Sequence, residues 1–136
     1  MSFEELYPKP ILRLAAEAEG ARRLPAPDIS VVRVNPLCGD RITLDLKIED
    51  ERVIALGYEV KACVLCQASA SVLARVAPGQ TRGHAEQLQA GLKAMLAEDG
   101  HPPSGFEAFT ATRPHKSRHA CVLLPLDALI EGLESI

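Results

Sequence analysis

The chain has no tryptophan, few other aromatic residues and no long apolar run. Its 136 residues include two tyrosines and three phenylalanines, so aliphatic side chains must supply most of the core. No apolar run approaches the roughly 20 residues that cross a bilayer. The acidic start of the chain, Met1 to Glu5, does not resemble a secretory signal either. We therefore expect a cytoplasmic protein with no membrane partner.

An excess of charge of either sign is also missing. The chain has fifteen Lys and Arg residues and eighteen Asp and Glu residues, which gives a net charge of −3, and the two signs are interspersed. This distribution lacks the basic stripe that contacts phosphates, so we expect no nucleic-acid partner. The length fits a single domain over residues 1–136 that buries a proper core.

Alternation of apolar and polar residues is the clearest local pattern. It predicts strands over Arg41–Glu49 and Arg52–Lys61, joined by a tight turn, and a third strand over Ser30–Val34. Three strands with one apolar face need a layer of helices over that face. The predicted fold class is α+β, with a three-stranded antiparallel sheet packed by helices, including N-terminal and C-terminal helices.

Helical spacing of apolar residues places the helices. One is expected from about Pro10 to Gly20, a second from Cys63 to about Ala77, and a third after the capping residue Thr81. Residues 106–111 are expected to be short helical or irregular. The last helix either starts at Pro125 or is kinked just after Cys121.

Four cysteines lie in three segments, each at a junction between predicted elements. They are Cys38, Cys63, Cys66 and Cys121. Structural disulfides are rare in the cytosol, so these thiols indicate metal binding, redox chemistry or core packing.

Cys38 and Asp40 flank a single glycine before the strand that starts at Arg41. Gly39 permits a turn, and residues two apart in an extended segment point to the same side. One thiolate and one carboxylate would then face a common ligand. The alternative is a buried cysteine beside an aspartate that caps a turn.

Cys63 and Cys66 form a Cys-x-x-Cys pair at the start of a predicted helix. The positive helix end lowers the pKa of a thiol placed there. A dithiol oxidoreductase that uses both thiols is one interpretation. No convincing strand follows Cys66, however, and that arrangement needs parallel strands. Core packing is the other interpretation for Cys66, because small thiols fill helix–sheet contacts well.

Cys121 follows Arg118 and His119. A histidine two residues away does not share a helical face with the cysteine, which disfavours His119 as a ligand. The basic neighbours make Cys121 the thiol that we expect to ionise most readily, and Cys38 on its turn should be the most mobile.

Together the segments offer three sulfurs and one oxygen, a tetrahedral set that zinc accepts. Iron–sulfur clusters prefer four cysteines, so a set with one carboxylate would hold a cluster less firmly. The predicted ligands are Cys38, Asp40, Cys63 and Cys121.

These motifs resemble the iron–sulfur cluster assembly scaffold family of the IscU, SufU and NifU N-terminal type. The resemblance rests on residues 35–40, the hairpin, Cys63 with the following Ala68–Ser71, and the late Cys121. It implies a small α+β domain whose ligands to zinc or a [2Fe-2S] cluster are the same four residues. It also implies a cysteine desulfurase that delivers sulfur to Cys38 or Cys121, and recipient apo-proteins or carrier proteins.

Three differences from the IscU branch favour the SufU-like branch. Ala120 stands where that branch has histidine, residues 111–116 lack the Leu-Pro-Pro-Val-Lys motif that binds a chaperone, and the spacing from Cys63 to Cys121 is longer. The chain is expected to be a non-enzymatic scaffold. A zinc-dependent sulfur acceptor, a dithiol oxidoreductase and a structural zinc module are the alternatives.

Overall fold

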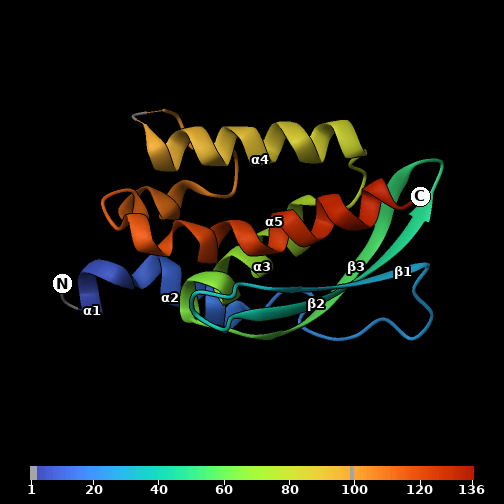
Figure 1. The fold of residues 1–136 in the computed structure, drawn as a ribbon, viewed down its shortest axis with the longest axis horizontal. Coiled ribbons are helices and arrows are strands. Elements are labelled where there is room, and N and C mark those ends of the chain that lie inside the picture. Colours follow the sequence, from blue (N-terminus) through green and yellow to red (C-terminus); the bar gives the residue numbers. More distant parts are fainter. Residues whose placement is uncertain (1–2, 99) are drawn as a thin grey trace.

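Three antiparallel strands form the sheet in the order β1-β2-β3 (Figure 1). They are β1 (Ile29–Val34), β2 (Arg41–Glu49) and β3 (Arg52–Lys61). The structure, a computed structural model, describes residues 3–98 and 100–136. Asp50 and Glu51, with φ of +52° and +63°, form the two-residue turn between β2 and β3, which suits the twist of a hairpin. The predicted sheet is thus confirmed.

Five α-helices and two short 3-10 helices complete the described part of the chain. They are α1 (Phe3–Leu6), α2 (Lys9–Glu17), α3 (Val64–Val76), α4 (Arg82–Ala97), η1 (Glu107–Thr112), η2 (Lys116–Arg118) and α5 (His119–Glu134). Helices α3 and α5 pack on one face of the sheet, and α4 lies on the side of α5 away from the strands (Figure 1). The predicted α+β class is confirmed, although α1 was not expected. No helix within the described ranges is long and apolar enough to span a membrane.

The core lies between the sheet and α3 and α5. Ile42, Leu44 and Leu46, alternate residues of β2, are fully buried there. Helix α5 approaches the strands closely at Gly132, where a Cβ would come within 2.9 Å of Leu46 Cδ1. The apolar face predicted from the period-two pattern is therefore the face that the helices cover.

A connector, residues 18–28, covers part of the opposite face of the sheet. Asp45, fully buried on that face, accepts hydrogen bonds from Arg23 Nε at 2.6 Å, Leu24 N at 3.0 Å and Ser30 Oγ at 2.6 Å. Burial alone would raise the pKa of Asp45, but these bonds outweigh it and lower the pKa. The connector passes close to Gly57, where a Cβ would collide with the Arg22 carbonyl. Only glycine therefore leaves room for the connector at this position.

Helix α5 begins earlier than Pro125, which lies inside it. The helix starts at His119, so Cys121 sits in its first turn. Proline has no N–H, and the Cys121 carbonyl therefore lacks the usual helical donor four residues on. Of the two alternatives for the last helix, a start at Pro125 is wrong. Thr81 caps α4 as predicted, by accepting a hydrogen bond from His84 N.

Candidate metal centre

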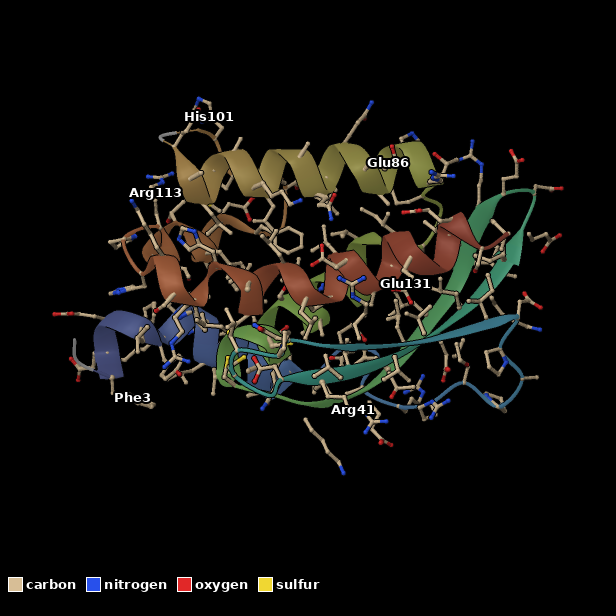
Figure 2. The ribbon with its side chains drawn as sticks, in the orientation of Figure 1. Phe3, Arg41, Glu86, His101, Arg113 and Glu131 are labelled. Atoms are coloured by element: carbon tan, nitrogen blue, oxygen red, sulfur yellow. The ribbon has the colours of Figure 1, made fainter. Side chains whose placement is uncertain are left out.

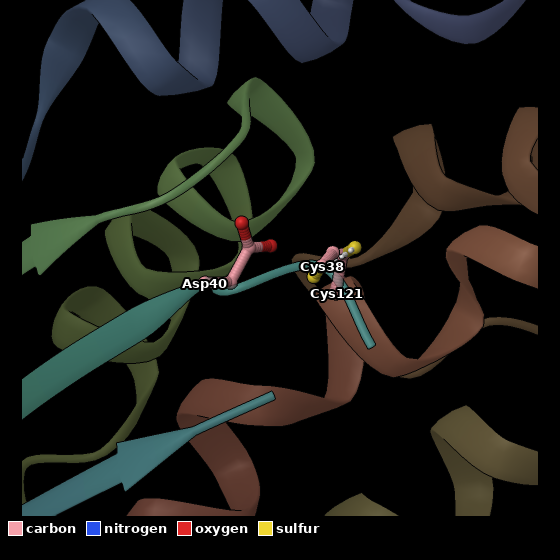
Figure 3. A group of neighbouring side chains, drawn as sticks. All are labelled: Cys38, Asp40 and Cys121. Carbon is pink, nitrogen blue, oxygen red and sulfur yellow. Dashed lines mark hydrogen bonds between the residues drawn. The ribbon is translucent and has the colours of Figure 1, made fainter. Parts of the chain in front are cut away.

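Side chains from the β1–β2 loop and the start of α5 meet at one end of the sheet (Figure 3). The sulfurs of Cys38 and Cys121 and a carboxylate oxygen of Asp40 all lie within 4.8 Å of one another. The two sulfurs are 4.0 Å apart although 83 residues separate them in sequence. The predicted convergence of distant segments is found for these three residues.

Asn35 shapes the loop that carries Cys38. Its buried side chain accepts a hydrogen bond from Leu37 N, and its backbone pairs with Gly39 N and with the Asp40 carbonyl, each at 2.8 Å. Gly39 has φ of +76°, a conformation that glycine adopts without steric strain. The result is a tight loop in which Cys38 is exposed and Asp40 is buried.

The two carboxylate oxygens of Asp40 have different surroundings. Oδ1 accepts a hydrogen bond from Cys63 N, at 3.2 Å, at the start of α3. Oδ2 is buried and has no hydrogen-bond partner within the described residues. A buried charged oxygen without a partner is unfavourable, and native proteins rarely leave one. A cation held between Asp40 and the two thiols would satisfy it, so the donor set fits a metal ion.

Cys63 lies at the N-cap of α3 and is half-buried, but it does not belong to the group within 4.8 Å. Its thiol interacts with that of Cys121: a hydrogen bond from Cys121 lowers the pKa of Cys63 to about 7, although burial opposes the shift. The Cys63 thiol, together with burial and the nearby Asp40 carboxylate, raises the pKa of Cys121. The expectation that Cys121 ionises most readily is therefore wrong, because the pKa of Cys121 is raised whereas that of Cys63 is lowered.

Arg118 lies beside these thiols, whereas His119 points elsewhere. Partial burial lowers the pKa of Arg118, but Tyr7, Cys63 and Cys121 outweigh it and the pKa is raised. The His119 ring nitrogen Nε2 pairs with the Thr112 and Arg113 carbonyls at 3.1 and 3.0 Å. His119 thus anchors the start of α5. This contact was not predictable from the sequence, because it depends on backbone carbonyls at the end of η1.

Cys66 faces the core and not the ligand group. It is fully buried in the first turn of α3, and burial strongly raises the pKa of its thiol. A thiol in this state is a poor nucleophile. Its surroundings favour the packing interpretation over a dithiol redox pair with Cys63.

The donor atoms decide which chemistry the site can support. Two thiols and a carboxylate within 4.8 Å suit zinc or iron, both of which bind thiolate. Cys63, whose thiol interacts electrostatically with that of Cys121, is the natural fourth donor, and its role as a ligand stays a prediction. When bound, such a metal would act as a Lewis acid toward a sulfur ligand.

Comparison with known proteins assigns the chain to a family. Residues 7–103 match the family described as NifU-like N terminal domain, a stretch that contains Cys38, Asp40 and Cys63 but not Cys121. An iron–sulfur cluster assembly scaffold protein IscU from Thermotoga maritima is 37% identical over 73 residues, which cover 54% of this chain and 51% of that protein. The match thus spans about half the length of the curated relative.

Solved structures agree with this fold over nearly the whole chain. A nitrogen-fixing NifU-like protein (N-terminal) from Brucella abortus has a TM-score of 0.91 and 35% identity, with 98% of this chain and 95% of that chain covered. A putative SUF-system scaffold protein from Fervidobacterium islandicum has a TM-score of 0.87 over 97% and 99% of the two chains, and its 19% identity supports the fold alone. The SufU-like branch stays a prediction. The chain belongs to the NifU-like N-terminal domain family.

Proposed function

We propose that this protein accepts sulfur from a cysteine desulfurase and assembles a [2Fe-2S] cluster on Cys38, Asp40, Cys63 and Cys121. The main observation that supports this proposal is the Asp40 carboxylate, which lies in one group with the Cys38 and Cys121 thiols and whose buried Oδ2 has no hydrogen-bond partner among the described residues. Membership of the scaffold family supports the same reading. Iron and the cluster are cargo in this proposal. A separate electron donor supplies the two electrons that convert each persulfide sulfur to the sulfide of the cluster, and recipient apo-proteins or carrier proteins take the product.

Cys38 is the better candidate for receiving sulfur. It is exposed on its loop, whereas Cys121 is 1% exposed. The Cys38 thiolate would attack the outer sulfur of a persulfide on the desulfurase. The new S–S bond forms as the old one breaks, and the desulfurase thiolate leaves. The loop position of Cys38 lets a partner reach it, and Cys121 remains the second candidate.

A zinc-dependent sulfur acceptor is the second candidate function, with the same residues. It is favoured by the mixed donor set, since a buried carboxylate oxygen beside thiols fits zinc as well as iron. In this version zinc orients the ligands, and sulfur passes on without a stable cluster.

Anaerobic incubation with iron and sulfide separates the two functions. The scaffold should develop visible absorbance from a bound cluster, and Cys38→Ser should reduce it strongly. Cys66→Ser is the matched control, because that thiol lies outside the ligand group. Absence of a band in protein that keeps zinc tightly bound would favour the acceptor.

Mapping of the sulfur tests both proposals. After reaction with a desulfurase and labelled cysteine, peptide mass analysis should find the extra sulfur on Cys38. Its appearance on Cys121 would move the acceptor role there, and failure to find it on either thiol would contradict sulfur acceptance. Asp40→Ala tests the structural zinc module, which predicts unchanged metal content, whereas both proposals predict weaker retention.

A further inference from the structure

The connector leaves the outer face of the sheet uncovered next to the metal centre. Its close contacts with Asp45 and Gly57 reach the cross-strand row that contains these residues and Ser30, and the Arg23 charge also interacts with Glu59 in the next row. Two further rows lie between that row and the Cys38 loop. They are Val32, Thr43 and Glu59, and then Val34, Arg41 and Lys61. We call these six residues the uncovered end.

The uncovered end combines apolar and basic side chains. Val32 and Val34 are 49% and 51% exposed, which is unusual for two β-branched residues on one strand face. Arg41 and Lys61 stand directly opposite each other on β2 and β3, and both are exposed. Arg41 projects on the side of the sheet away from the helices (Figure 2).

The basic pair is unfavourable in the isolated protein. Like charges directly opposite each other destabilise a sheet. Among the described residues neither Arg41 nor Lys61 forms an ion pair within 4.0 Å, although Glu59 and Thr43 line the same groove of about 130 Å³. A partner that brings carboxylates to this groove would relieve the repulsion.

The position of the uncovered end limits what can bind there. Residues 35–40, the loop with Cys38, join Val34 to Arg41, so the last row borders the site directly. Leu37, 93% exposed, extends the apolar surface onto the same loop. A protein that approaches Cys38 from this face must contact Val34 and Arg41.

We propose that the uncovered end docks the sulfur-donating protein through a surface that carries carboxylates around an apolar centre. This inference rests on the proposed function, because it takes a protein persulfide as the sulfur source. Charge complementarity would speed the encounter and orient the donor over Cys38, and salt would weaken it.

The test is the dissociation constant of the complex with the cysteine desulfurase of the same organism, measured at about 50 mM and about 500 mM salt. Arg41→Glu with Lys61→Glu should raise this constant about tenfold at low salt, with a smaller difference at high salt. The matched control is Lys47→Glu with Lys93→Glu. It changes the net charge equally, and Lys47 lies on the same face of β2 about 20 Å from Arg41.

Each outcome has a separate meaning. Equal constants for the two double variants, with normal sulfur acceptance by the natural protein, would overturn the docking inference alone. A natural protein that neither binds the desulfurase nor accepts its sulfur would overturn the proposed function and this inference with it. Weaker binding of a recipient apo-protein with unchanged desulfurase binding would assign the surface to another occupant. If the charge reversal prevents folding, Arg41→Gln with Lys61→Gln removes the two positive charges without adding negative ones. This variant should also raise the dissociation constant.

Discussion

At the scale of single residues, Asp40 makes the site more than a pair of neighbouring thiols. Its Oδ1 accepts a hydrogen bond from Cys63 N at the start of α3, and its Oδ2 is buried without a hydrogen-bond partner among the described residues. The same carboxylate therefore positions Cys63 and offers the oxygen ligand. A substitution at Asp40 is expected to disturb both.

Cys66 provides the first residue-scale prediction. Cys66→Ser places a hydroxyl in a fully buried site and should lower the free energy of unfolding by about 1–3 kcal/mol, because its hydrogen bonds to water are lost. Cys66→Ala introduces no polar group and should cost less. Denaturant unfolding measures both, and metal content should stay as in the natural protein. Loss of metal from Cys66→Ala would instead make this thiol a ligand.

Cys63 provides the second residue-scale prediction. In the metal-free protein its alkylation rate should rise with pH and be half-maximal near pH 7, because the thiolate is the reactive form and its pKa is about 7. Cys121→Ala removes the hydrogen-bond donor, so the midpoint should move to higher pH. Mass analysis of iodoacetamide-treated peptides gives the rates. A midpoint near the ordinary cysteine value of about 8.5 in the natural protein would contradict this assignment.

At the scale of elements, the connector and the start of α5 are both fixed by hydrogen bonds between distant parts of the chain. Asp45 of β2 holds the connector, and Ser69 of α3 donates to the Val122 carbonyl of α5 at 2.6 Å. Arg113 Nε, which follows η1, donates to the Met95 carbonyl at the end of α4. These bonds place Cys121 opposite the Cys38 loop.

A substitution at Gly57 tests whether the connector packs rigidly on the outer face of the sheet. Gly57→Ala would push its Cβ into the Arg22 carbonyl, so we expect the free energy of unfolding to fall by about 1–3 kcal/mol. Gly83→Ala, in the first turn of α4, meets nothing closer than 3.8 Å and should stabilise by up to about 1 kcal/mol, since alanine favours helix. Chemical denaturation compares the two, and similar effects would show that the connector moves aside freely.

The sequence predicted regular elements better than the contacts between them. Period-two alternation placed β2 and β3 correctly because most of their apolar residues face one helical layer. Ile54 was expected on that face but is 50% exposed, because an irregularity in the pairing brings Val53 to the buried side. The buried role of Asp45 was not predictable, since an aspartate between apolar residues looks solvent-exposed until a distant connector supplies donors. In the same way, the order of thiol ionisation failed because the contact between Cys63 and Cys121 forms only in the folded chain.

At the scale of the whole molecule, the candidate centre joins two segments that are far apart in the sequence. A metal bound to Cys38, Asp40 and Cys121 ties the β1–β2 loop to the start of α5 and favours the folded state by mass action. At a free zinc concentration about 100 times its dissociation constant this gives about 2.7 kcal/mol.

Removal of the metal should therefore lower thermal stability. Chelation should reduce Tm by roughly 10 °C for a chain of this size, and added zinc should restore it. Asp40→Ala should show a smaller difference between loaded and stripped protein, whereas Cys66→Ala should show the full difference. Differential scanning calorimetry gives these values. An unchanged Tm on chelation would mean that no metal bridges the segments.

The 83-residue separation of Cys38 and Cys121 also bears on how the protein folds. Contacts between residues so far apart form slowly, because a long loop must close before they contribute. Cys63 and Cys66, only three residues apart, can capture a metal in the unfolded chain long before the native donors meet. Zinc present from the first moment of refolding should thus delay folding through a local misligated species, whereas zinc added after α5 has docked finds its native donors already assembled.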